Sequence, residues 1–161
     1  MVNQVATDIN SYLSFSLDEE YFAANVGKVL EILEVTKITK VPKVPDFMRG
    51  VINLRGQVLP VVDTRIKFGL PPAEATQDTC IVVVEMHMDD EVLNVGILVD
   101  AVEEVLEIDE SDILPPPSIG SKFRSEFIHG MARNEEEFLM ILNVDKILSF
   151  DEKQVIKEHL N

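Results

Sequence analysis

Hydrophobic and polar residues alternate along most of this chain. In the segment YLSFSL, Leu13, Phe15 and Leu17 alternate with a tyrosine and two serines. A period of two places the first set on one face of a strand, because successive side chains of a strand point to opposite faces. The segment is therefore predicted to be a β-strand with one face in a core.

Short apolar runs of the same kind continue to the end of the chain. Polar breaks at residues 89–90 and 134–137 have the length of hairpin turns. Further strands are predicted at residues 21–24, 29–33, 51–54, 58–62, 79–86, 92–99, 102–108, 128–132 and 138–142. Many short strands separated by turn signals favour an all-β sandwich or barrel over a parallel α/β sheet.

Helix is predicted in two short places only. Residues 64–68 form one helical turn, which Gly69 and two following prolines end. In SFDEKQVIKEHL, Ser149 and Glu152 make the S-x-x-E pattern of a capping box, and apolar residues follow at helical spacing. The chain is thus expected to close with a short amphipathic helix.

The chain also contains a weak internal duplication. Residues 26–32, VGKVLEI, align with VEEVLEI at 102–108, and residues 50–68 align without a gap with residues 130–148. Proline-bearing connections lie between the aligned blocks in both copies, Pro42 and Pro45 in one and Pro115 to Pro117 in the other. The repeat predicts two five-stranded barrels. Each is too small to be stable alone, so the two are expected to pack on a shared apolar seam.

Composition narrows the possible partners and compartments. With 161 residues, 46% of them hydrophobic, the chain is long enough for a core without disulfide or metal. A formal charge of −15 opposes binding to nucleic acid and to anionic membranes. The N-terminus lacks the pattern of a signal peptide, no apolar run approaches bilayer length, and Cys80 is the only cysteine. A cytoplasmic protein is expected, with Cys80 as a small buried hydrophobe.

The sequence gives little support for catalysis. Asp63 and Asp100 each end an apolar strand before a turn, which is typical of capping residues. The acids at 107, 109, 110 and 112 lack the spacing of a calcium loop, and motifs for phosphate binding or nucleophilic catalysis are missing. The histidines at 87, 129 and 159 are far apart. No enzyme activity, metal or cofactor is predicted.

One cation is conspicuous against this background. The stretch GVINLRGQVLPVVD places Arg55 before Gly56, between two apolar strands. Glycine at a tight turn permits positive φ, so Arg55 is predicted at the tip of a hairpin. Its guanidinium either pairs with a nearby carboxylate or anchors an interface, and the two roles are compatible.

The runs VPDFMRGVINLRGQVLPVVDTRIKFGL, VGILVDAVEEVLEI and MILNVDKIL resemble the CheW family, the coupling proteins of bacterial chemotaxis. The resemblance extends from about residue 12 to 148. It implies a CheW-like domain over residues 1–148, made of two SH3-like β-barrels, with a C-terminal helix over 149–161. Subdomain 1 is expected at about residues 18–78, and subdomain 2 at about 12–17 plus 79–148.

The resemblance also implies a function. It is that of a non-catalytic adaptor that couples the cytoplasmic tips of methyl-accepting chemoreceptors to the histidine kinase CheA. The first barrel is expected to dock onto the regulatory domain of CheA, and a groove between the barrels to take the receptor tip. Alternatives are a CheW-like regulatory domain of a larger CheA or CheV protein, for whose other modules 161 residues leave no room, and a ligand-binding β-barrel module.

Four partner-binding positions carry over from the family pattern, namely Val29, Glu31, Gly50 and Arg55. Each has a simpler reading: Val29 as a seam residue, Glu31 as a solvated carboxylate on the face opposite Leu30, and Gly50 as a backbone requirement. The sequence departs from the pattern at residues 23–25, which leaves the wall of the groove in question.

Overall fold

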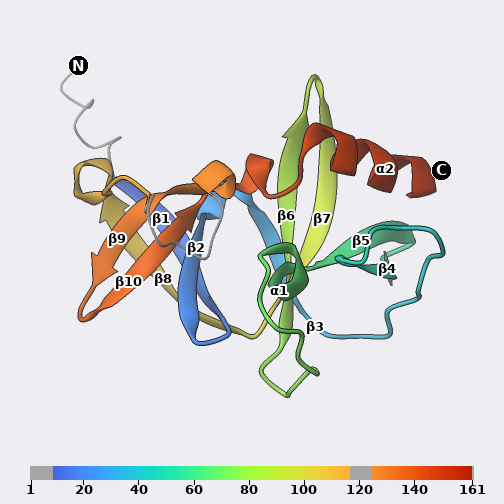
Figure 1. Cartoon of the computed structure of the whole chain (residues 1–161), viewed down its shortest axis with the longest axis horizontal. Helices are drawn as coiled ribbons and strands as arrows, with labels where there is room; N and C mark the ends of the chain where they lie inside the picture. The colour runs from blue at the N-terminus through green and yellow to red at the C-terminus, as the bar shows by residue number, and fades with distance from the viewer. Residues whose placement is uncertain (1–8, 117–124, 161) are drawn as a thin grey trace.

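The computed structural model describes residues 9–116 and 125–160, which form two five-stranded sheets side by side (Figure 1). Barrel 1 has the strand order β3-β6-β7-β5-β4, and barrel 2 has the order β8-β1-β2-β10-β9. The strands of barrel 1 are β3 (Val29–Glu34), β4 (Met48–Leu54), β5 (Gln57–Asp63), β6 (Cys80–Met88) and β7 (Glu91–Val99). Those of barrel 2 are β1 (Ile9–Leu17), β2 (Glu20–Asn25), β8 (Ala101–Asp109), β9 (Ile128–Asn134) and β10 (Glu137–Leu142). The predicted all-β, two-barrel fold and its ten strands are confirmed.

Tight turns set the register of the hairpins. Asp18 and Glu19 between β1 and β2 have φ of 52° and 69°, and Arg55 and Gly56 between β4 and β5 have φ of 51° and 85°. Two successive positive φ values are those of the turn whose twist matches a two-residue hairpin. The predicted turns at residues 89–90 and 134–137 are also confirmed, between β6 and β7 and between β9 and β10.

The predicted subdomain boundaries differ from the sheets. β2 was expected in subdomain 1 but pairs with β1 in barrel 2, and the β6–β7 hairpin was expected in subdomain 2 but lies in barrel 1. The reason is that β6 pairs antiparallel with β3 while β7 pairs in parallel with β5. The strands of barrel 1 thus come from one continuous segment of the chain. Barrel 2 combines the N-terminal hairpin β1–β2 with β8, β9 and β10 from the C-terminal part of the chain.

The duplication is visible in this arrangement. The five strands of barrel 1 correspond to those of barrel 2 as follows: β3 to β8, β4 to β9, β5 to β10, β6 to β1 and β7 to β2. The parallel pair β5·β7 of barrel 1 matches the parallel pair β10·β2 of barrel 2. Each barrel also has an isolated bridge after its matched glycine, Thr39 to Val51 in one and Leu114 to Met131 in the other. Barrel 2 is therefore a circularly permuted counterpart of barrel 1.

The main core lies between the barrels. Among the described residues, the seam cluster contains 24 buried hydrophobic residues, whereas each barrel interior contains six. Strands contribute alternate residues to the two environments: Val82 and Val84 of β6 face the seam, while Ile81 and Val83 face the interior of barrel 1. The predicted shared seam is thus the largest apolar unit of the fold.

Helices cover the ends of the barrels. They are α1 (Thr64–Lys67), α2 (Phe150–Leu160), and the 3-10 turns η2 (Val26–Lys28), η3 (Glu110–Asp112), η4 (Ser125–Phe127) and η5 (Val144–Lys146). The predicted capping box is present, because Ser149 N–H donates to Glu152 Oε1 at 2.8 Å and Glu152 N–H donates to Ser149 Oγ at 3.1 Å. No helix in the described part of the chain has the length and apolar character to cross a bilayer.

Cys80 and Gly69 each lie at or beside the end of an element. Cys80 is half-buried against the seam rather than fully buried, because it lies at the first position of β6, where its Sγ is 3.3 Å from Asp78 O. Gly69 has a φ of 80° and follows α1, as predicted. Pro117 and Asn161 lie outside the described residues.

Candidate functional site

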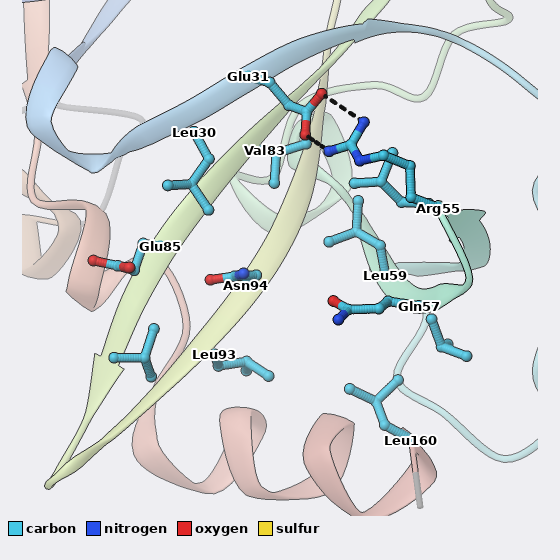
Figure 2. A pocket seen from close by; sticks show the side chains of 13 residues that line it. Leu30, Glu31, Arg55, Gln57, Leu59, Val83, Glu85, Leu93, Asn94 and Leu160 are labelled. Atoms are coloured by element: carbon cyan, nitrogen blue, oxygen red, sulfur yellow. Dashed lines mark hydrogen bonds and ion pairs between the residues drawn. The ribbon is translucent and has the colours of Figure 1, made fainter.

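The mouth of barrel 1 is a hollow of about 670 Å³ at one open end of the barrel (Figure 2). Its floor contains Leu59 and Val83, which also belong to the interior cluster of the barrel. The exposed side chains of Leu30, Val58 and Val92 surround this floor. The other lining residues are Glu31, Leu54, Arg55, Gln57, Glu85, Leu93, Asn94 and Leu160. The mouth is a mixed surface, apolar in its depth and polar at its rim.

Arg55 stands at the rim of the mouth on the β4–β5 turn. Asn53 Oδ1 accepts a hydrogen bond from Gly56 N–H at 2.8 Å, which fixes the turn beneath it. The Arg55 side chain is 70% exposed, and its guanidinium pairs through both terminal nitrogens with the carboxylate of Glu31. The hydrogen bond and the charge of Glu31 raise the pKa of Arg55. The pairing with a nearby carboxylate is therefore present and the side chain is still largely exposed, while its role as an interface anchor stays a prediction.

A β-bulge at Leu30 brings Glu31 to this rim. Val29 is opposite Val84 and Glu31 is opposite Val83, so one extra residue of β3 lies between two adjacent residues of β6. Residues directly opposite each other in antiparallel strands share a face. Val29 accordingly packs against the seam, and Glu31 faces the mouth together with Leu30. The expectation that Glu31 and Leu30 lie on opposite faces was wrong, because it assumed unbroken alternation.

Gly50 lies away from the mouth, buried in β4. Its φ is 148°, and a Cβ built on it is 2.9 Å from Ile38 Cγ2 and closer still to Thr39 O. The chain at Thr39 therefore passes directly over this glycine. Of the four candidate residues, the structure brings Glu31 and Arg55 together and leaves Val29 and Gly50 in structural positions.

A second concavity, the inter-barrel cleft, has a volume of about 520 Å³. Barrel 1 contributes Glu85 and His87, and the η2 connection contributes Gly27 and Lys28. Barrel 2 and its following turn contribute Tyr12, Asn25, His129, Ile141, Leu142, Asn143 and Val144. Residue-by-residue reasoning missed these positions, because they come together only through the tertiary fold.

The cleft wall contains one of the positions at which the sequence departs from the family pattern. Ala23 and Ala24 are fully buried, whereas Asn25 lines the cleft and its Oδ1 accepts the Gly27 N–H at 2.7 Å. Burial, together with the charge of Glu110, raises the pKa of Tyr12 despite a hydrogen bond with Asn25. Tyr12 is therefore a neutral hydroxyl in this wall.

The acids expected as caps have structural partners. Asp63 caps α1, because its Oδ1 accepts a hydrogen bond from the Ile66 N–H at 3.2 Å. Its Oδ2 accepts a second hydrogen bond from Arg49 Nη1 at 2.7 Å. Among the described residues, no group of three or more His, Cys, Asp or Glu side chains is placed to hold a metal.

Asp100 lies where the chain passes from barrel 1 to barrel 2. Arg65 of α1 donates to both of its carboxylate oxygens, at 2.9 and 2.7 Å, and the Asp18 N–H donates at 2.8 Å. Burial alone raises the pKa of Asp100, but these hydrogen bonds and the charge of Arg65 lower it below its ordinary value of 3.8. Asp100 thus joins α1 of one barrel to the first turn of the other.

The hydrogen bonds of Asp100 predict that the stability of the fold depends on pH. A carboxyl whose pKa is lower in the folded state stabilises the fold above its unfolded pKa and loses that contribution as the pH falls through its folded pKa. We expect the free energy of unfolding to decrease as the pH drops below about 4. Asp100→Asn should make this acid limb of the stability curve less steep. Urea unfolding followed by circular dichroism from pH 7 to 2 measures both. Asp90→Asn, in the exposed β6–β7 turn, is the control, and an unchanged limb in Asp100→Asn contradicts the assignment.

Comparisons with known proteins agree with this fold over nearly the whole chain. Residues 11–152 match the family model of the CheW-like domain. The chain is 31% identical over 145 residues to the chemotaxis protein CheW of Klebsiella aerogenes, covering 90% of this chain and 85% of that protein. It is 34% identical over 142 residues to the chemotaxis protein CheW of Rhizobium meliloti, covering 88% and 89%. The crystal structure of the scaffolding protein TtCheW from Thermoanaerobacter tengcongensis aligns with a TM-score of 0.80 at 32% identity, covering 89% of this chain and 90% of that one.

Proposed function

The chain belongs to the CheW-like family, and on that premise we propose that it is a non-catalytic chemotaxis adaptor that couples chemoreceptors to a CheA-type histidine kinase. Two concave surfaces on barrels that share one apolar seam suit a protein that holds two partners side by side. The proposal puts the protein in the cytoplasm, where the kinase and the receptor tips are found.

The mouth of barrel 1 is the proposed contact with the kinase regulatory domain. The observation that carries this assignment is the Glu31–Arg55 pair at the rim of an apolar hollow (Figure 2). Arginine is enriched among the residues that dominate interface energies, and a partly exposed guanidinium keeps donors available for a second acceptor. The exposed Leu30, Val58 and Val92 supply apolar area that a partner side chain would cover.

The inter-barrel cleft is the proposed contact with the receptor tip. Both barrels contribute to its lining, which combines the apolar Ile141 and Val144 with Lys28, Glu85 and the Tyr12 hydroxyl. A helical hairpin presents both apolar and charged residues along one edge, which this lining accommodates. Each contact need bury only about 1,200 Å² or less, because an array of receptors and kinases raises the effective concentration of every link.

Arg55→Ala tests the proposal at the mouth. We expect the unfolding midpoint to change little, because the side chain is largely exposed. Binding to the kinase regulatory domain should weaken by roughly 1 to 4 kcal/mol, the cost of removing an interface anchor. Thermal unfolding and isothermal titration with the purified regulatory domain measure the two effects.

Arg133→Ala is the matched control, since Arg133 is an exposed arginine near the tip of the corresponding β9–β10 hairpin of barrel 2. A lowered midpoint with unchanged affinity per folded molecule would assign Arg55 to structure alone. A pull-down from native cytoplasm separates the classes of function: a retained kinase and receptor support the adaptor, and a retained small metabolite supports a ligand-binding barrel instead.

A further inference from the structure

The strongest unexplained feature of the molecule is a buried lysine in the C-terminal helix. Lys153 is only 6% exposed, and its ammonium donates to His87 O at 2.7 Å and to Asp145 O at 2.6 Å. Burying a lysine is unfavourable unless its ammonium is hydrogen-bonded, and burial lowers the pKa of Lys153. Such a position therefore calls for a structural or functional reason.

The two acceptors of Lys153 belong to different barrels. His87 is in β6 of barrel 1, and Asp145 is in η5, the turn that follows β10 of barrel 2. Two backbone carbonyls that meet at one ammonium are held in a fixed relation, because both bonds must keep their length and direction. Lys153 thus links one point of each barrel through a single charged group.

The carboxylate of Asp145 makes a parallel link. Its Oδ1 accepts a hydrogen bond from the His87 N–H at 2.9 Å. Lys28 Nζ donates to both carboxylate oxygens, at 2.9 and 3.0 Å. Lys28 belongs to η2, where the chain passes from barrel 2 to barrel 1, and its ammonium is also 2.8 Å from His87 Nδ1. Three segments therefore meet at this point, and α2 supplies the fourth through Lys153.

This cluster lies between two cavities. Lys28 and His87 line the inter-barrel cleft, whereas His87, Asp145 and Lys153 line a hollow of about 570 Å³ beneath the start of α2. Lys153 does not line the cleft itself. Lys153 therefore reaches a molecule in the cleft only indirectly, through the placement of His87 and of the barrels that form the cleft.

The rest of α2 is attached mainly to barrel 1 and to the seam. Glu152 pairs with Lys67 of α1 at 3.1 Å, Lys157 pairs with Glu91 of β7, and Ile156 is fully buried in the seam. Figure 1 shows α2 lying across the end of barrel 1, above β5 and beside β7. Among the polar side-chain contacts described for α2, those of Lys153 reach both barrels.

We infer that Lys153 is a positioning residue: through its two carbonyl partners, α2 fixes the angle between the barrels and with it the width of the inter-barrel cleft. The inference rests on the proposed function only in that the cleft takes the receptor tip. A cleft held at its binding width keeps the competent fraction of molecules near one, and a looser junction lowers that fraction and raises the apparent Kd in proportion.

Lys153→Met tests the barrel junction directly. Methionine matches the length of the lysine stem but removes the ammonium that donates to both carbonyls. Spin labels at Val58→Cys and Val105→Cys, in a Cys80→Ser background, report the distance between β5 of barrel 1 and β8 of barrel 2, because both valines are exposed. The expected result is a broader distance distribution in Lys153→Met, with the distribution of Lys146→Met unchanged. Lys146 is an exposed lysine of η5 and the matched control.

A folded Lys153→Met protein with an unaltered distribution overturns the inference, whether or not any partner binds. If Lys153→Met does not fold, Lys153→Gln serves in its place, because its amide keeps a donor for one carbonyl but is one bond too short to hold both His87 O and Asp145 O. Broadening in Lys153→Gln then supports the junction, and an unaltered distribution contradicts it.

Binding tests the second half of the inference. With a purified receptor-tip fragment as the probe, Lys153→Met should raise the Kd about tenfold if roughly one molecule in ten keeps the competent width. Binding of the kinase regulatory domain should change less than about twofold, because the mouth is built almost entirely within barrel 1. Broadened distances with an unchanged receptor-tip Kd refute the link between junction and cleft. Wild-type protein that binds no receptor tip refutes the proposed function instead, while the distance measurement still decides the role of Lys153.

Discussion

Gly50→Ala is expected to lower the free energy of unfolding by about 3 to 5 kcal/mol, the range of the most damaging single substitutions. Two costs combine at this position. The φ of 148° is one that an L side chain rarely adopts, and the new methyl group overlaps Thr39 O, a backbone atom that cannot turn aside. Small domains are stable by only about 5 to 15 kcal/mol, so this substitution removes a large part of the stability of the folded protein. Urea unfolding and the yield of folded protein measure the effect.

Gly56→Ala separates the two costs. Gly56 also has a positive φ, of 85°, but a Cβ there meets no atom within 4 Å. Only backbone strain remains, so the loss should be about 1 to 2 kcal/mol. A Gly50→Ala protein that is as stable as Gly56→Ala, yet fails to bind the kinase, would show that Gly50 acts at an interface and not in the fold.

The positions of strands could be predicted because one face of nearly every strand is buried. Alternation in the segment around Phe15 therefore marks a strand directly, and short apolar runs bounded by turn residues mark the other nine. Arg55 was predicted at a hairpin tip for an equally local reason, the glycine that follows it. The capping box of Ser149 and Glu152 is local as well. Each of these features is encoded within a few neighbouring residues.

The features that escaped prediction depend on distant parts of the chain. The parallel pairing of β7 with β5 decides that β6 and β7 belong to barrel 1, and parallel pairing leaves no turn motif in the sequence. The bulge at Leu30 reverses the face of Glu31 relative to Val29, although VLEILE reads as plain alternation. Lys153 looks like a solvated helical lysine until the carbonyls of His87 and Asp145 are brought to it.

The last prediction concerns the seam as a single cooperative unit. Phe68, at the end of α1, stacks on Phe127 with ring centroids 4.3 Å apart and packs against Phe22 of β2 at 5.4 Å. Phe22 in turn packs on Phe15 of β1. A ring from the barrel 1 side is thus inserted among three rings of barrel 2. Phe68→Ala should therefore destabilise both barrels, by about 3 to 5 kcal/mol in total.

The two tyrosines make this prediction testable without added probes. Tyr12 and Tyr21 both lie in barrel 2, and the chain has no tryptophan, so intrinsic fluorescence reports barrel 2 while circular dichroism reports both barrels. Phe68→Ala should move the urea midpoints of the two signals together, because coincident transitions are the mark of one cooperative unit. Phe138→Ala, on the exposed face of β10, removes the same side chain from outside the seam and should cost less than about 1 kcal/mol. A fluorescence midpoint that stays in place while circular dichroism shifts would mean that the barrels unfold independently, and an adaptor whose two sites share one rigid body could not be built on such a seam.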